Sequence, residues 1–199
     1  MDLRPSYPVP TDRTELRPLR RGDAPALAAY RGRPEVCRFV PFEPMGVDEV
    51  LRRLEGDWAR TVLDTEGQAL FLGVELRATG TVVGDLMLRW DSFRDRGGEI
   101  GYVFNPEYAG HGLATEAAHA LLHLAFDQLR LHRVVARVDA RNRRSALLAA
   151  RLGMRQEAHL VENEWFKGAW SDELDFALLS SEWESMHRAR GSHPGTGSG

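Results

Sequence analysis

The fold of this 199-residue chain is decided by the stretch Glu99-Ile100-Gly101-Tyr102-Val103-Phe104-Asn105-Pro106-Glu107-Tyr108-Ala109-Gly110-His111-Gly112-Leu113-Ala114-Thr115-Glu116. A segment typical of a strand runs through two glycines and an alanine into a long amphipathic helix. Glycine lets a ligand come close to the backbone, and the first turn of a helix carries unpaired N–H groups and a positive dipole potential. The stretch therefore predicts a phosphate site, and with it a phosphorylated cofactor.

The bulk composition is that of an ordinary globular domain, with 43% apolar and 28% charged residues and a net charge of −3. We expect one domain over residues 11–183, an N-terminal extension over 1–10 and a disordered tail over 187–199. The charge balance gives no sign of a nucleic-acid surface. No apolar run reaches the ~18 residues that span a bilayer and residues 1–10 lack a signal-peptide core, so we expect a cytoplasmic protein with no membrane partner.

The single cysteine, Cys37, excludes an intrachain disulfide and favours a reducing compartment. A nucleophilic role for its thiol is possible in principle, but an ordinary buried thiol is the favoured interpretation.

The hydrophobic pattern predicts the element order β-α-α-β-β-β-α-β-α-β-β. Residues 31–45 contain three prolines and are expected to form only short helical pieces or loop. An antiparallel meander that switches to a central βαβ unit predicts an α+β fold with a mixed sheet of about seven strands and about four helices. Strands are expected at 14–19, 69–77, 81–90, 99–104, 133–139, 154–166 and 171–179, and helices at 23–30, 48–62, 112–130 and 142–152.

The glycine motif alone is also compatible with a dinucleotide-binding fold, in which Asp139 would close the next strand. Three features oppose that interpretation. Thr115 takes the place of the third small residue, the unit follows a meander instead of opening a domain, and no further βαβ units follow. The other alternative is a glycine-rich turn that binds no ligand.

A second motif lies one βα unit downstream, where Asn142 and Ser145 share one face at the start of a helix. Asn142 alone is simply a good N-cap. Together with the glycine motif it makes the chain, over about residues 11–183, resemble the GCN5-related N-acetyltransferase (GNAT) superfamily, and within it the Rim-type ribosomal-protein N-terminal acetyltransferases. The closer match is carried by Glu99-Ile-Gly-Tyr102, Pro106-Glu-Tyr108, Ala114-Thr-Glu116-Ala, Asn142-x-x-Ser145, Leu152-Gly153-Met154 and Glu164-Trp-Phe-Lys-Gly168-x-Trp170-x-Asp172.

The resemblance implies acetyl-CoA as co-substrate and no metal. In this family the strand before the glycine loop splays from its neighbour, and the pantetheine arm lies in the gap. Asn142 would bond that arm, and the Ser145 hydroxyl would sit near the thioester sulfur. The implied cofactor-binding residues are Tyr102, Val103 and Phe104 for the strand, Gly110, His111, Gly112, Leu113, Ala114 and Thr115 for the pyrophosphate loop, and Asn142 and Ser145.

Two positions depart from the family pattern. Ala109 stands where an arginine or glutamine is usual, and Ala149 stands where many relatives carry the tyrosine that protonates the leaving thiolate. Ser145 is the natural substitute for that tyrosine, because a hydroxyl can stabilise a thiolate and a thiol pKa is only ~8.5.

The reaction also needs a base, because an ammonium group has no lone pair for attack on a thioester. Glu164 lies at the position of the carboxylate assigned as base in the Rim-type branch. Glu99 is the second candidate, since a glutamate on the strand before the glycine loop acts through water in other branches. For both residues the alternative is a solvated carboxylate without a catalytic role.

The resemblance implies a primary amine as acceptor, and a protein N-terminus, a small amine such as an aminoglycoside and a free amino acid all remain open. Its floor is expected to come from residues 31–45 and from the hairpin that carries Glu164. The rival from another functional class is a non-catalytic acyl-CoA-binding module, which would need neither Ser145 nor Glu164. The sequence leaves a monomer and a homodimer open.

Two further groups have weaker signals. His119 and His123 are one turn apart and could bind a metal, but they share a polar helix stripe, so a solvated face is favoured. Arg141, Arg143 and Arg144 either meet the 3′-phosphate of CoA or are plain surface charges.

Overall fold

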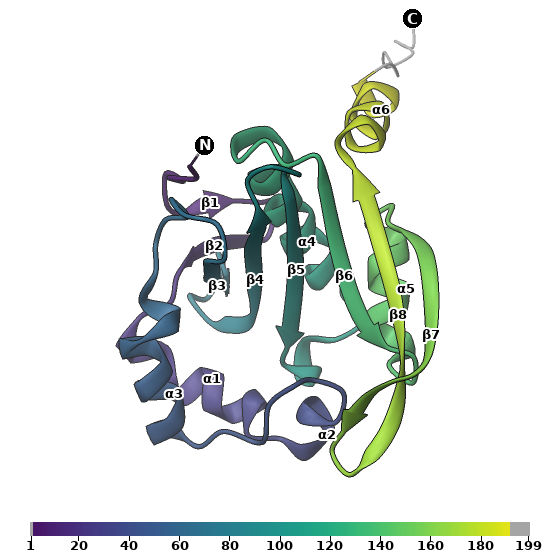
Figure 1. Cartoon of the computed structure of the whole chain (residues 1–199). Coiled ribbons are helices and arrows are strands. Elements are labelled where there is room, and N and C mark those ends of the chain that lie inside the picture. The colour runs from purple at the N-terminus through teal and green to yellow at the C-terminus, as the bar shows by residue number, and fades with distance from the viewer. Residues whose placement is uncertain (1, 192–199) are drawn as a thin grey trace, which may run out of the picture.

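A single eight-stranded sheet forms the centre of the computed structural model, which describes residues 2–191 (Figure 1). Its strand order is β1-β2-β3-β4-β5-β6-β8-β7, and every neighbouring pair is antiparallel except β5 and β6, which are parallel. The strands are β1 (Val9–Pro10), β2 (Thr14–Pro18), β3 (Ala69–Leu76), β4 (Val82–Ser92), β5 (Gly97–Phe104), β6 (Arg133–Asp139), β7 (Arg155–Phe166) and β8 (Ala169–Leu179). The predicted α+β class, with a meander joined to a central βαβ unit, is confirmed.

Helices cover both faces of this sheet (Figure 1). The α-helices are α1 (Ala24–Arg31), α2 (Pro34–Cys37), α3 (Val47–Glu55), α4 (Leu113–His123), α5 (Arg143–Arg151) and α6 (Ser180–Gly191). The helix expected at 48–62 ends at Glu55, because Gly56 follows in a non-helical conformation and a short 3₁₀ turn takes over at Asp57–Ala59. The helix expected at 112–130 continues beyond His123 only as a π-helical turn, Leu124–Gln128.

Both ends of the expected domain differ from the sequence-based boundaries. Leu3 is fully buried and bridges Leu63, and β1 pairs with β2, so residues 2–10 belong to the domain and are not an extension. At the other end α6 includes residues 187–191, which the composition had placed in a disordered tail. The rest of that predicted tail, residues 192–199, lies outside the described residues.

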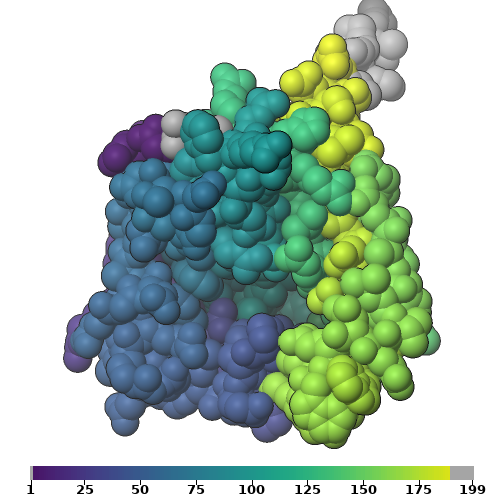
Figure 2. Space-filling view, viewed as in Figure 1, coloured from purple at the N-terminus to yellow at the C-terminus, as the bar shows by residue number. Residues whose placement is uncertain are grey.

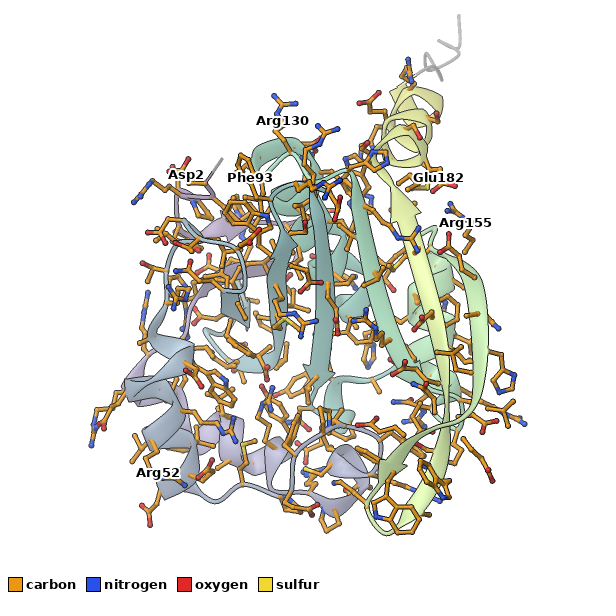
Figure 3. All side chains as sticks on the ribbon, in the orientation of Figure 1. Asp2, Arg52, Phe93, Arg130, Arg155 and Glu182 are labelled. Carbon is orange, nitrogen blue, oxygen red and sulfur yellow. The ribbon has the colours of Figure 1, made fainter. Side chains whose placement is uncertain are left out.

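α6 is anchored by one buried tryptophan and an ion pair. The ring of Trp183 stacks on Phe126, and its indole N–H donates to the Asp127 carboxylate over 3.2 Å. Arg155 of β7 pairs with Glu182, and Figure 3 shows the two side chains together beside α6. His119 packs against Trp183 at 4.8 Å between ring centres, so the helix face that was expected to be solvated is partly covered by α6.

The larger apolar core lies where α4 and α5 pack on one face of the sheet. Ala117, Ala118, Leu121 and Leu122 of α4 are all fully buried there. Alanines on a helix allow it to approach a sheet closely, so α4 lies near the strands that lead into and out of the glycine loop. This packing fixes the N-terminus of α4 relative to β5.

The second core lies on the opposite face, under α1 and α3, and contains a buried ion pair. The Arg31 Nε donates to Asp85 Oδ1 on β4 over 2.9 Å, and Tyr30 donates its hydroxyl to the same carboxylate. The Arg31 guanidinium also lies over the rings of Phe42 and Trp58, at 4.5 and 4.6 Å. Since a buried charge is tolerated only when it is paired and hydrogen-bonded, Asp85 and Arg31 depend on each other.

We therefore expect Asp85→Asn to lower the free energy of unfolding by about 3–5 kcal/mol, because it leaves a buried guanidinium without its counter-charge. Urea unfolding followed by far-UV circular dichroism measures this loss. The double variant Arg31→Met, Asp85→Leu should lose less than Asp85→Asn alone, because it removes both charges. A single variant within about 1 kcal/mol of wild type would show that the ion pair is not the element that holds α1 on β4.

Candidate active site

β5 and β6 pair over only three residues and then separate. The parallel ladder joins Gly97 to Arg133, Gly98 to Val134 and Glu99 to Val135. Beyond Glu99, β5 continues along β4 while β6 continues along β8, and Figure 1 shows the two strands diverging. Within the described residues, 100–104 therefore have no strand partner on the β6 side. Their N–H and C=O groups on that side are suited to a ligand with an extended polar chain.

Tyr102 crosses this gap on the face covered by α4 and α5. Its hydroxyl donates to the carbonyl oxygen of Ser145, in the first turn of α5, over 2.9 Å. Burial raises the pKa of Tyr102, although an interaction with the Ser145 side chain opposes the shift, so the phenol stays protonated and donates to the carbonyl. The bond ties α5 to β5 and places Ser145 beside the gap.

Asn142 is the N-cap of α5, as its sequence position predicted. Its Oδ1 accepts a hydrogen bond from the Ser145 N–H over 3.2 Å. The cap does not use the amide Nδ2, which is the atom that could donate to a carbonyl of a ligand. Asn142 and Ser145 are thus brought together at the end of the gap.

The glycine loop has the backbone that its sequence requires. Gly110 and Gly112 adopt φ values of +87° and +77°, in the left-handed region that favours glycine. A Cβ atom at Gly110 would meet nothing within 4 Å, so the loop is open on that side. Gly112 directly precedes α4, so the amides of residues 110–115 gather at a helix N-terminus.

Arg13 holds this loop in place through side-chain hydrogen bonds, a role that the sequence analysis did not predict. Its Nη1 donates to the carbonyl of His111 and its Nε to the Glu116 carboxylate, each over 2.8 Å. Burial raises the pKa of Glu116, but hydrogen bonds from Thr11 and Arg13 outweigh it and hold that pKa below its ordinary value. Glu116 belongs to the same polar stripe as His119 and His123, which the sequence predicted to be solvated. A carboxylate in the first turn of α4 was the available signal, but its arginine partner lies about 100 residues earlier.

The two candidate bases have different environments. Glu99 is bound by Arg89, over 2.5 Å, and by Arg137. Burial raises its pKa, and the two guanidinium groups oppose that shift. Glu164 is exposed on β7, opposite Ser171.

A bulge in β7 sets the position of Glu164. The register passes from the pair Leu160–Glu173 directly to Glu164–Ser171, so three residues of β7 oppose Asp172 alone. The Asp172 carboxylate accepts the Glu162 N–H over 2.9 Å and contacts His159 over 2.8 Å. Both bonds lower the pKa of Asp172, the one from the Glu162 N–H more strongly, and they keep the carboxylate ionised.

Glu173 and Asp175 add two carboxylates that sequence reasoning missed. They alternate along β8, and Asp175 is opposite Arg137 of β6. Burial raises the pKa of Glu173, and the negative charges of Asp175, Glu164 and Glu99 raise it further. The two candidate bases therefore share one acidic face with β8. The Glu-x-Asp alternation on the last strand was the signal that could have revealed it.

A hollow lies in front of this face. Figure 2 shows it between the central strands, the segment around α1 and α2, and the β7–β8 hairpin. The hairpin tip reaches the α2 segment, where Lys167 Nζ donates to the carbonyl of Phe42 over 2.8 Å. The two parts of the chain expected to form the acceptor floor are thus in contact.

The remaining sequence candidates lie outside this arrangement. Cys37 is buried, and burial raises its pKa, so the prediction of an ordinary buried thiol is confirmed. Arg141 is paired with Asp139, which is the residue that a dinucleotide fold would need for a ribose. Across residues 2–191 no group of three or more His, Cys, Asp or Glu side chains is placed to hold a metal ion. Among these described residues, no helix is long and apolar enough to cross a membrane.

Comparisons with known proteins all point to one family. Residues 13–155 match the family model described as an acetyltransferase (GNAT) domain. The uncharacterised N-acetyltransferase p20 of Bacillus licheniformis is 30% identical over 176 residues, which cover 87% of this chain and 96% of p20. The ribosomal protein uS5-alanine N-acetyltransferase of Escherichia coli is 29% identical over 188 residues, covering 90% and 94%.

Solved structures agree with the sequence matches. A GNAT-family acetyltransferase from Bacillus anthracis superposes with a TM-score of 0.78 at 25% identity, covering 92% of this chain and all of that one. The family model spans both the glycine loop and the Asn142–Ser145 motif, and the diverging strands lie between them in the fold. This chain belongs to the GNAT family and is an acetyl-CoA-dependent N-acetyltransferase.

Proposed function

We propose that the protein transfers the acetyl group of acetyl-CoA directly to the α-amine of a protein N-terminus. The observation that carries the proposal is the gap between β5 and β6, which ends at the glycine loop on one side and faces the carboxylates of Glu99, Glu164 and Glu173 on the other. An acidic face favours a cationic acceptor. A small polyamine or an aminoglycoside would satisfy the same charge and is the second candidate.

Exposed aromatic side chains favour the polypeptide acceptor. Trp165 and Trp170 are 61% and 55% exposed at the end of the β7–β8 hairpin, with ring centres 5.5 Å apart. Leu160 and Val161 add exposed apolar surface on the same hairpin. An exposed apolar pair such as Trp165 and Trp170 beside a site is typical of contact with another protein. A polyamine offers it no apolar side chains.

The residues at the gap fit the cofactor that the family uses. In the proposal, the amides of residues 110–115 hold the pyrophosphate, the backbone of residues 102–104 holds the pantetheine arm, and Asn142 Nδ2 donates to that arm. The open side of Gly110 and the unpaired edge of β5 leave room for both contacts. When bound, acetyl-CoA supplies a thioester carbonyl as the electrophile and a thiolate as the leaving group.

Two side chains then serve the transfer, one carboxylate and one hydroxyl. Glu164 or Glu99 takes the proton of the ammonium group, directly or through one water, because only the neutral amine can attack. An α-amine has a pKa of ~8, so a carboxylate suffices near neutral pH. The Ser145 hydroxyl donates to the sulfur as negative charge develops on it. Cys37 is buried and takes no part, so no covalent enzyme intermediate is needed.

The rival function is a non-catalytic acyl-CoA sensor. A free-thiol release assay with acetyl-CoA and a panel of N-terminal peptides, polyamines and aminoglycosides separates the candidates. Peptide-dependent thiol release, with an N-terminal mass gain of one acetyl group, supports the proposal. Release with polyamines alone would assign the small-amine acceptor, and tight acetyl-CoA binding without release for any acceptor would support the sensor.

We predict that Gly112→Asp abolishes acetyl-CoA binding. The substitution strains a left-handed position and puts a negative charge where the pyrophosphate should lie. Isothermal titration calorimetry with acetyl-CoA measures the effect. Gly67→Asp is the matched control, since Gly67 has a similar φ of +84° in a distant turn. Equal affinity in Gly112→Asp and in the control would show that the pyrophosphate is bound elsewhere.

Ser145→Ala should lower kcat about ten- to hundredfold, the range for a lost hydrogen bond to a charged group. Its acetyl-CoA affinity should change little, because thiolate charge develops only during the reaction. Steady-state kinetics together with calorimetry separate the two effects. Ser185→Ala on α6 is the control. A normal kcat for Ser145→Ala would remove the hydroxyl from the mechanism and leave it as a residue that only faces the gap.

Glu164→Gln should lower kcat/KM about 10²–10⁴-fold if Glu164 is the base. The loss should shrink as pH rises toward ~8, because neutral amine then becomes abundant without a base. Glu99→Gln is the paired variant. The raised pKa of Glu99 would move the acid limb of the wild-type pH profile above the ordinary range of a glutamate, if that residue were the base.

The pair of profiles decides between the two carboxylates. A large, pH-dependent loss in Glu99→Gln with none in Glu164→Gln would assign the proton transfer to Glu99. A loss in Glu164→Gln that is uniform across pH, with a raised acceptor KM, would make Glu164 a binding carboxylate for the cationic acceptor.

A further inference from the structure

The side chain of Lys167 joins two parts of the chain that are 125 or more residues apart in sequence. Its Nζ donates to the carbonyl of Cys37, at the end of α2, over 2.7 Å, and to the carbonyl of Phe42 over 2.8 Å. The Glu43 carboxylate lies 3.5 Å from the same nitrogen. Lys167 is the only lysine in the sequence. Hydrogen bonds from an ammonium group are stronger than those between neutral groups, so this contact is a firm one.

The turn that presents Lys167 is tight and unusual. Lys167 and Gly168 have φ values of +50° and +83°, which is the pattern of a two-residue hairpin turn. Glycine adopts this conformation without cost, whereas it is uncommon for a residue with a side chain. A strained position is maintained only where the surroundings require it. At this turn, the interactions that accompany the strained conformation are the two hydrogen bonds from the Lys167 ammonium group to the carbonyl oxygens of Cys37 and Phe42.

Phe42 links the Lys167 contact to β4, the strand that pairs with β5. The ring of Phe42 lies 4.5 Å from the Arg31 guanidinium, which is buried against Asp85 on β4. Asp85 is opposite Val103 of β5 in the sheet register. The Lys167 contact therefore connects the β7–β8 hairpin to the same frame that holds the unpaired edge of β5.

Glu164 lies three residues before Lys167 on this hairpin. The hairpin borders the hollow in front of the acidic face, and the segment around α2 borders it next to the hairpin tip (Figure 2). We propose that Lys167 is a positioning residue for the acceptor, because it ties the hairpin that carries Glu164 to residues 38–45 of the expected floor (31–45) and so sets the width of the hollow. The inference rests on the proposed function, since it concerns the same acceptor site.

Lys167→Met tests the tie, because methionine has similar length but no donor and no charge. The KM for the peptide or amine acceptor should rise about tenfold, the lower end of the range for lost hydrogen bonds from a charged group. The acetyl-CoA affinity and kcat at saturating acceptor should stay near wild type. Lys167→Arg keeps donors at this position and should restore most of the KM. Arg151→Met, an exposed basic residue of α5, is the control that should change nothing.

Hydrogen–deuterium exchange measures whether Lys167 holds residues 38–45 in place, and it needs no catalytic turnover. The amides of residues 38–45 should exchange faster in Lys167→Met than in wild type, and those of residues 78–80, in the distant β3–β4 turn, should not. If the wild type acetylates no acceptor, the proposed function fails, and the exchange result still stands on its own.

Two outcomes would overturn the inference. Unchanged exchange over residues 38–45 would show that Lys167 does not hold the floor. Faster exchange with an unchanged acceptor KM, or a loss confined to kcat, would show that the tie does not position the acceptor. Thermal unfolding checks that each variant folds, and Lys167→Gln replaces Lys167→Met, with the same expectations, if the methionine variant does not fold cooperatively.

Discussion

The whole arrangement depends on the short parallel ladder between β5 and β6. Parallel strands need a crossover between them, and here the crossover is the glycine loop followed by α4. Because the ladder ends at Glu99, the sheet opens on the side where the crossover begins. The open edge of β5, the helix N-terminus and the first turn of α5 are consequently neighbours, and all three are polar.

Two hydrogen-bonded links keep that opening from closing or widening. Tyr102 holds the start of α5 at a fixed distance from β5 through the Ser145 carbonyl. Arg13 holds the glycine loop through His111 and Glu116. Neither link uses the backbone N–H groups that face the gap, so the groups that would bind a cofactor are held in place by others. Such support from surrounding residues is what precise binding sites require.

The side proposed for the acceptor differs from the cofactor side, because it presents charged side chains instead of backbone N–H and C=O groups. Glu99 is paired with both Arg89 and Arg137, while Glu164 and Glu173 have fewer cationic neighbours. The bulge ordered by Asp172 brings Glu164 to the same face. A cationic amine would therefore meet several carboxylates, which suits both recognition of the charge and removal of one proton.

Local sequence patterns predicted strands β2 to β8, the main helices, the glycine loop and the Asn142 cap, because each depends on residues close together in the chain. What they missed depends on distant partners. The Arg13–Glu116 and Lys167–Phe42 contacts join segments that are more than 100 residues apart, and no short motif encodes them. The docking of Trp183 on Phe126 likewise anchors α6, whose residues 187–191 had been expected in a disordered tail.

The most direct test of this account is amide exchange over the two segments that border the gap, measured by NMR with and without acetyl-CoA. The account predicts that exchange slows both at residues 110–115 and at residues 102–104, and stays unchanged at the β3–β4 turn, residues 78–80. Slowing that is absent from residues 102–104, or that is confined to another part of the sheet, would contradict the claim that the cofactor lies between β5 and β6.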